Sequence, residues 1–151
     1  MAETEFRPLK EVGAIAYSPT SDVRFYVDEF RGRRYAAVRR FLKSPRYTGP
    51  TRSGVTLDAE MLGKVVAAVE THAKNGAAAQ EAELGRFTRR PGVDLVVRIQ
   101  VYKDRPGIDI REWLESEQYK GWSKKGVRIP HEKLQEVLAH LRGLQLALGE
   151  K

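Results

Sequence analysis

The residues in this sequence best suited to a chemical task are arginines spaced among large aromatic rings. They recur on alternate positions in two segments, 22–42 and 94–114. Because successive side chains of a strand point to opposite faces, each segment presents one apolar face and one basic, aromatic face. Exposed rings can stack on nucleobases while guanidinium groups hold phosphates. A duplex hides the faces of its bases, so this pattern favours a platform for single-stranded nucleic acid.

The outward face, the turns and the later loops supply the candidate contacts. We predict that nucleic acid binds at Phe30, Arg31, Arg33, Arg39, Phe41 and Arg52 in the first segment and its following loop, and at Tyr102, Lys103, Arg105, Arg111, Trp113, Lys124 and Lys125 in the second. The alternative is that the rings pack between the two halves of the molecule. Arg39 and Arg111 weigh against it, since buried unpaired arginines are costly, although Asp28, Asp109 or Glu112 could pair with some of the arginines.

Residue patterns for catalysis are missing from the sequence. There is no cysteine, no glycine-rich phosphate loop, and no metal-ligand spacing around the three histidines, His72, His131 and His140. Asp109 and Glu112 are better interpreted as partners of arginines than as an acid–base pair. We therefore expect no enzymatic activity, no cofactor, no metal and no small-molecule substrate.

The two segments belong to a longer internal repeat. Residues 11–70 align with 83–142 without a gap, and 16 of 60 positions are identical, whereas chance would give about 4. Such a repeat predicts two copies of one supersecondary unit that pack as an intramolecular pseudo-dimer. We expect a flexible tail over 1–10, a first unit over 11–72, a linker over 73–82 and a second unit over 83–148.

Within each unit, period-two alternation predicts strands and a later apolar stripe predicts a helix. In the first unit we expect strands at 11–19, 22–30 and 35–42, then a loop and a short strand at 54–57. Asp58 would cap the first helix, and Pro130 would lie in the first turn of the second. The fold class is therefore α+β, with two tandem ββββα units, each an antiparallel curved sheet whose apolar face is covered by a helix.

Charge supports a polyanionic partner. The chain has a net charge of +7, and the excess lies in the two units rather than in the tail or linker. Residues 22–54 carry nine basic and three acidic side chains, against seven and six in 94–126, so the first half of the surface is the more basic. With no transmembrane run or signal peptide visible, we expect a soluble cytoplasmic protein, at the nucleoid in a bacterium or nuclear in a eukaryote.

These residues resemble the transcriptional positive cofactor 4 (PC4) family of single-stranded DNA-binding domains. The resemblance rests on VRFYVDEFRGRRYAAVRRFL with PTRSGVTL, and on VRIQVYKDRPGIDIREWL with SKKGVRIPHEKLQEVL. It implies paired sheets that form a channel for a single strand, with contacts at the turn residues, at the third-strand arginines and at Lys124 and Lys125. The first unit departs from the family pattern at Ala36–Val38, and the tandem Pur-type repeat shares the same plan.

Two other functions stay open at this level. The same surface could bind RNA, because nothing in the sequence addresses a 2′-hydroxyl. Alternatively, the chain could be a protein-interaction module, since Leu144, Leu146 and Leu148 exceed the needs of one helical stripe. That excess predicts a homodimer of pseudo-dimers.

Overall fold

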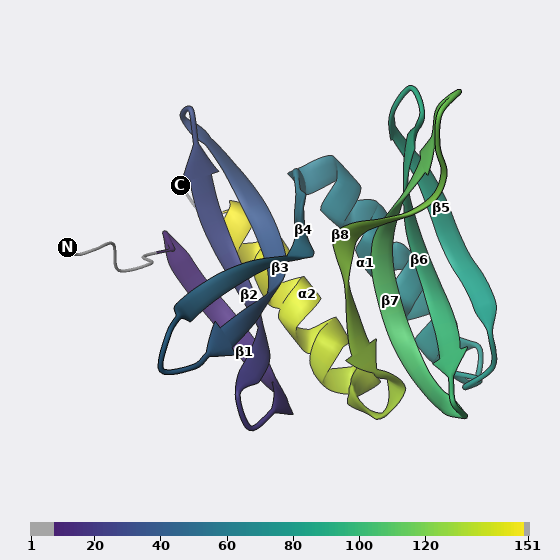
Figure 1. Ribbon diagram of the computed structural model, residues 1–151, viewed down its shortest axis with the longest axis horizontal. Helices are drawn as coiled ribbons and strands as arrows, with labels where there is room; N and C mark the ends of the chain where they lie inside the picture. Colours follow the sequence, from purple (N-terminus) through teal and green to yellow (C-terminus); the bar gives the residue numbers. More distant parts are fainter. Residues whose placement is uncertain (1–7, 150–151) are drawn as a thin grey trace.

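The computed structural model describes residues 8–149, which form two successive ββββα units. The first unit consists of β1 (Lys10–Ser18), β2 (Ser21–Phe30), β3 (Arg33–Lys43), β4 (Thr48–Leu57) and α1 (Ala59–Lys74). The second consists of β5 (Ala82–Arg90), β6 (Val93–Tyr102), β7 (Arg105–Glu115), β8 (Lys120–Pro130), the 3-10 turn η1 (His131–Lys133) and α2 (Leu134–Gly149). Each unit is one antiparallel meander, in the order β1-β2-β3-β4 or β5-β6-β7-β8 (Figure 1). The predicted fold class is confirmed.

Three local expectations need adjustment. The fourth strand is not the short 54–57 segment but the ten-residue β4, because the segment expected to be a loop pairs with β3. Asp58 caps α1 as expected, accepting a hydrogen bond of 2.8 Å from the Met61 backbone N–H, whereas Pro130 ends β8 and precedes η1. Most of the predicted tail over 1–10 lies outside the described residues, and β1 already begins at Lys10.

The two units exchange their helices, which the sequence did not predict. Helix α2 packs on β1, β2 and β3 of the first unit, and α1 packs mainly on β5 of the second. His140 of α2 packs at a tilt against Phe25 of β2, with ring centroids 4.9 Å apart. A side chain at Gly13 in β1 would collide with the same histidine ring. Each sheet is therefore covered by the helix of its twin, so neither unit completes its core alone.

One continuous core follows from this exchange. It joins Val23, Phe25 and Val27 of β2, their counterparts on β6, and the apolar stripes of both helices. The helices also pack against each other, and Arg142 of α2 forms an ion pair of 2.6 Å with Glu70 of α1, its equivalent under the 72-residue repeat. None of the described helices is long and apolar enough to span a membrane.

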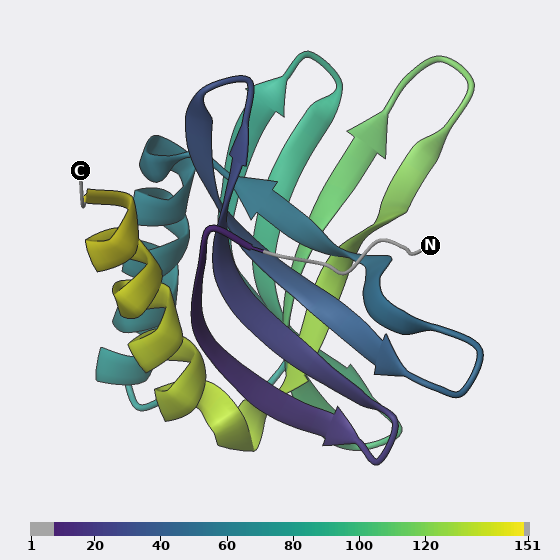
Figure 2. The same cartoon turned by 90° about the vertical axis from the view of Figure 1, so that its left-hand side faces the viewer.

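The helices occupy one side of the molecule and leave the outer faces of both sheets open (Figure 2). Strands β4 and β8 lie side by side where the two sheets meet. The hairpin tips β2–β3 and β6–β7 lie at opposite ends of the molecule (Figure 1). The open face therefore runs from one tip, across β4 and β8, to the other tip.

Candidate nucleic-acid interface

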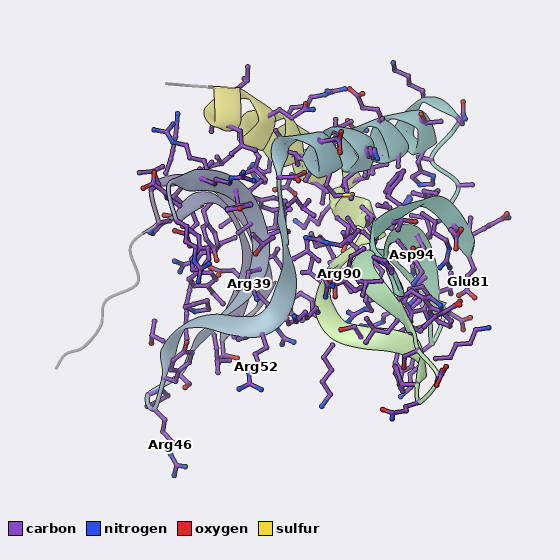
Figure 3. The ribbon with its side chains drawn as sticks, turned by 90° about the horizontal axis from the view of Figure 1, so that it is seen from above. Arg39, Arg46, Arg52, Glu81, Arg90 and Asp94 are labelled. Atoms are coloured by element: carbon purple, nitrogen blue, oxygen red, sulfur yellow. The ribbon has the colours of Figure 1, made fainter. Side chains whose placement is uncertain are left out.

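A bulge interrupts β4 and β8 at the same place in both units. On β3 the register passes from Arg39 to Phe41, while on β4 it passes from Gly54 to Pro50, so residues 51–53 have no partner in the ladder. The same irregularity separates Arg111 from Trp113 opposite β8. Extra residues in one strand bend it and re-aim its side chains. Here the bulge carries Arg52 in one unit and Lys124 and Lys125 in the other, and Figure 3 shows Arg52 projecting from the ribbon.

Residues shared by the two repeats hold this bulge in place. Arg39 donates a hydrogen bond of 3.0 Å to the Thr51 carbonyl, and Arg111 does the same to Ser123 at 3.0 Å. Gly54 lies so close to β3 that an added Cβ would be 2.6 Å from a backbone oxygen. The repeat therefore preserves the means of presenting the bulge. Arg39 and Arg111 are half-buried supports of the surface as well as candidate contacts.

The two bulges meet and are joined by hydrogen bonds between the units. Ser53 donates from its hydroxyl to the Gly126 carbonyl at 2.9 Å, and Arg89 donates to the Thr56 carbonyl at 2.8 Å. Between them lies a groove of about 520 Å³, which we call the inter-unit groove. Its basic lining comprises Arg39, Arg52, Arg89, Arg90, Lys124 and Lys125. The fold thus brings predicted residues from both units into one basic groove.

Sequence reasoning missed two of these cations, Arg89 and Arg90. They are the last two residues of β5. In the 72-residue repeat they align with Tyr17 and Ser18 of the first unit, so the two copies do not share a basic pair at this place. Arg89 lies 3.7 Å from the Glu112 carboxylate, which fulfils the expectation that Glu112 pairs with an arginine. The basic strand end itself was visible in the sequence, but not its proximity to β4.

Several of the predicted cations keep their charge uncompensated. Among residues 8–149, no ion pair involves Arg31, Arg33, Arg39, Arg52, Lys103, Arg105, Lys124 or Lys125. Arg111 differs, because it lies 3.2 Å from the buried Asp109 carboxylate. Because acidic residues of the protein do not neutralise these cations, the surface attracts a polyanion. The positive electrostatic field of the protein is concentrated in the groove.

The predicted aromatic residues divide into two exposed and two packed rings. Phe30 and Tyr102 occupy equivalent hairpin tips and are 63% and 60% exposed. Arg31 and Lys103 extend over these rings. Both rings can therefore be approached from solvent, and neither contributes to the contact between the units. At the tips, packing of the aromatics between the units is excluded.

Phe41 and Trp113 do not form an open stacking platform. Phe41 is only 2% exposed and packs edge-to-face on Tyr26, with Arg24 above its ring at 4.4 Å. Trp113 is half-buried and packs edge-to-face on Trp122. The expectation that both rings lie free on the outer face is wrong, because Arg24 and Tyr26 cover Phe41, while Trp122 and Arg86, 5.7 Å from the ring centroid, lie against Trp113.

An ion cluster lies beneath the outer face of the second unit. Asp109 is 1% exposed and accepts hydrogen bonds from Arg98 at 2.9 Å and Arg111 at 3.2 Å. Arg98 also lies over the Trp122 ring at 3.8 Å. A buried carboxylate requires such partners. These arginines are therefore less free to meet a phosphate than their position in the sequence suggests.

The histidines form no metal site within the described residues, where no group of three metal-ligating side chains occurs. His72 and His131 do meet, with their Nε2 atoms 2.9 Å apart. Burial and the neighbouring His131 lower the pKa of His72 below its ordinary value. The pair joins the end of α1 to η1 and thus links the two units.

Comparison with known proteins bears on the second unit. The family described as "Transcriptional Coactivator p15 (PC4)" matches residues 92–140. This range runs from the turn before β6 into α2. The second unit is therefore similar to the PC4 family. The resemblance inferred from the sequence is confirmed there, and the first unit repeats the PC4-like arrangement of strands and helix at an offset of 72 residues.

Other comparisons add little to the PC4-like assignment. No curated protein sequence matches the chain significantly. Among solved structures, the crystal structure of WHY3 from Arabidopsis thaliana is similar, with 10% identity and a TM-score of 0.39, covering 95% of this chain and 94% of that chain.

Proposed function

We propose that this protein binds single-stranded DNA with little sequence preference and without catalysis. The observation that carries the proposal is the inter-unit groove, where six basic residues from both units converge around the two bulges. Exposed rings at the two hairpin tips extend the same face. Backbone-tracking cations combined with accessible rings are the features of single-strand binding without base readout.

The geometry favours a single strand over a duplex. The groove is formed by two bulged strands and leads to isolated rings at the hairpin tips. These rings can stack only on bases that are already unpaired. No helix lies on the open face to enter a major groove, since both described α-helices cover the opposite side (Figure 2). RNA offers the same phosphates and unpaired bases, so the titration described below also includes an RNA oligonucleotide.

The PC4-like second unit supports a role near transcription, because the family's name describes a transcriptional coactivator. We propose that the protein acts in the DNA-containing compartment of the cell, because its proposed ligand is found there. Self-association through α2 has less support than the sequence suggested. Leu144 is buried in the core and Leu148 is partly buried against it, so that Leu146, 74% exposed, is the free leucine of the three.

Fluorescence titration tests the proposal directly. Trp122 lies beside the bulge of β8 and Trp113 packs on it, so binding along the groove should change tryptophan emission. We expect a larger change and tighter binding with oligo-dT than with duplex DNA of the same length, and a steep loss of affinity with added salt. Equal or tighter binding to duplex would refute single-strand binding, and tighter binding to oligo-U would reassign the ligand to RNA.

A further inference from the structure

We infer that the first unit, and not the second, holds one unstacked nucleobase in a pocket on its outer face. The inference deepens the proposed function and rests on it, since the base arrives as part of a bound strand. The pocket, which we call the unit-one pocket, has a volume of about 550 Å³. This lies within the range of small-ligand sites, roughly 300–1,000 Å³. Phe30 and Tyr35 are its accessible rings, Tyr26 lies beneath them at 3% exposure, and the Asp28 carboxylate also lines it.

A row of three cross-strand neighbours lies beneath the hollow. Tyr26 on β2 lies opposite Ala37 on β3, which in turn lies opposite Thr56 on β4. Directly opposed residues of antiparallel strands share one face of the sheet. Ala37 and Tyr26 are only 2% and 3% exposed, so this row forms a packed floor, and the hollow lies above it, between Phe30 and Tyr35. Tyr35, two residues from Ala37 toward the tip and therefore on the same face, forms the outer wall.

The equivalent row in the second unit is filled. Arg98, Asp109 and Arg128 replace the tyrosine, alanine and threonine in the same register. Asp109 receives the Arg98 guanidinium at 2.9 Å, and Arg128 donates to the Gln100 side chain at 3.0 Å. These side chains satisfy one another on the surface where a base would have to lie.

The outer wall is missing from the second unit as well. Tyr35 corresponds to Gly107 under the 72-residue repeat. A Cβ built on Gly107 would collide with the Arg128 guanidinium, which therefore already covers that position. The two units thus offer different surfaces to a strand: a ring-walled pocket in one and a packed layer of ion pairs and hydrogen bonds in the other.

The polar groups of the unit-one pocket suit the edge of a base. Arg39 donates to the Thr56 hydroxyl at 3.3 Å and also hydrogen-bonds to Tyr26. Burial raises the pKa of the Tyr26 hydroxyl, although Arg39 opposes the shift, so this hydroxyl stays protonated at neutral pH. Rings that stack and a few polar groups that meet the edge are what a planar heterocycle requires.

The pocket continues into the inter-unit groove, because Arg39, Arg52 and Thr56 line both. A strand whose phosphates cross the groove at Arg52 can therefore place the adjoining base between Tyr35 and Phe30. The opposite unit gives no matching place for a base. Since a DNA strand has a direction, one pocket per chain breaks the pseudo-twofold symmetry and favours one orientation of the bound strand.

The test uses oligonucleotides that separate the base from the backbone. A 12-residue abasic oligodeoxynucleotide is compared with the same oligonucleotide carrying one central thymidine. In the native protein the single base should tighten binding by at least about fivefold, the lower end for one base–aromatic stack. Tyr35→Ala should remove this gain. Phe30→Ala, which removes the other accessible ring of the pocket, should remove it too. Tyr17→Ala, an exposed ring of β1 outside the pocket, should keep it.

A crosslink locates the base independently of these variants. With 5-iodouracil as the single base, irradiation should attach the oligonucleotide to Phe30 or Tyr35. Adducts confined to the second unit, at Tyr102, would overturn the inference, as would a base-dependent gain that survives both Tyr35→Ala and Phe30→Ala. Failure of the native protein to bind any of these oligonucleotides in a salt-dependent way would instead refute the proposed function itself.

Discussion

Removing the two lysines of the β8 bulge should change how binding depends on salt by a predictable amount. Lys124 and Lys125 line the inter-unit groove and form no ion pair within residues 8–149. Each phosphate neutralised on a single strand contributes about 0.7 to the slope of log affinity against log salt. If each lysine meets one phosphate, Lys124→Gln/Lys125→Gln should reduce the slope by about 1.4. Between 50 and 200 mM salt, the native protein should then lose about sevenfold more affinity than the variant.

Fluorescence anisotropy of labelled oligo-dT at five or six salt concentrations measures both slopes. The control is Lys64→Gln/Lys74→Gln, which removes the same charge from exposed positions of α1 on the opposite side of the molecule. It should lower affinity slightly through net charge and leave the slope near the native value. Equal changes of slope in the two variants would mean that overall charge, and not the groove, governs binding.

Three further changes test the fold that presents this surface. Asp109→Ala leaves two arginines without their buried acid and should lower the free energy of unfolding by about 3–5 kcal/mol; an unchanged urea midpoint would contradict the role of the cluster. Gly54→Ala should lower both stability and oligo-dT affinity, because its Cβ would collide with the backbone of β3, whereas Gly63→Ala, in open space on α1, should stabilise the protein by roughly 1 kcal/mol. Because the pKa of His72 is lowered in the folded state, the unfolded chain binds this proton first as pH falls. The thermal midpoint should be highest above about pH 6.5 and fall below it, and His131→Asn should make that fall smaller; an identical pH profile in the variant would rule out the pair as its source.

Local periodicity was enough to predict the strands and helices, because both copies show the same alternation and each supports the register of the other. The bulges could not be predicted from periodicity. The residues that form the β4 bulge, Thr51 to Ser53, lie next to Pro50 and resemble loop residues, and only their pairing on either side shows that the strand continues. The helix exchange was also beyond prediction, since the apolar stripe of α2 fits either sheet in sequence terms.

For the candidate site, residue type predicted the charge but not its availability. The exposed rings at the hairpin tips, Phe30 and Tyr102, are where the alternation placed them. Phe41 is also on the predicted face, yet it is buried, because Tyr26 and Arg24 on the neighbouring strand cover it. Which neighbours stand across a strand pair, and whether they cover a ring, depends on register rather than on composition.

By itself, the sequence determined that this protein is a tandem repeat of one ββββα unit with a basic, aromatic outer face, because both facts follow from residue order and periodicity. Only the tertiary structure decided that the helices exchange, that the two bulges converge, and that Arg89 and Arg90 complete the groove. The physical reason is that these features depend on packing between segments far apart in the sequence, such as Thr56 with Arg89 and Phe25 with His140. It also decided that one unit keeps a pocket where the other is filled: Ala37 and Asp109 are aligned in the sequence, but their consequences appear only among their neighbours.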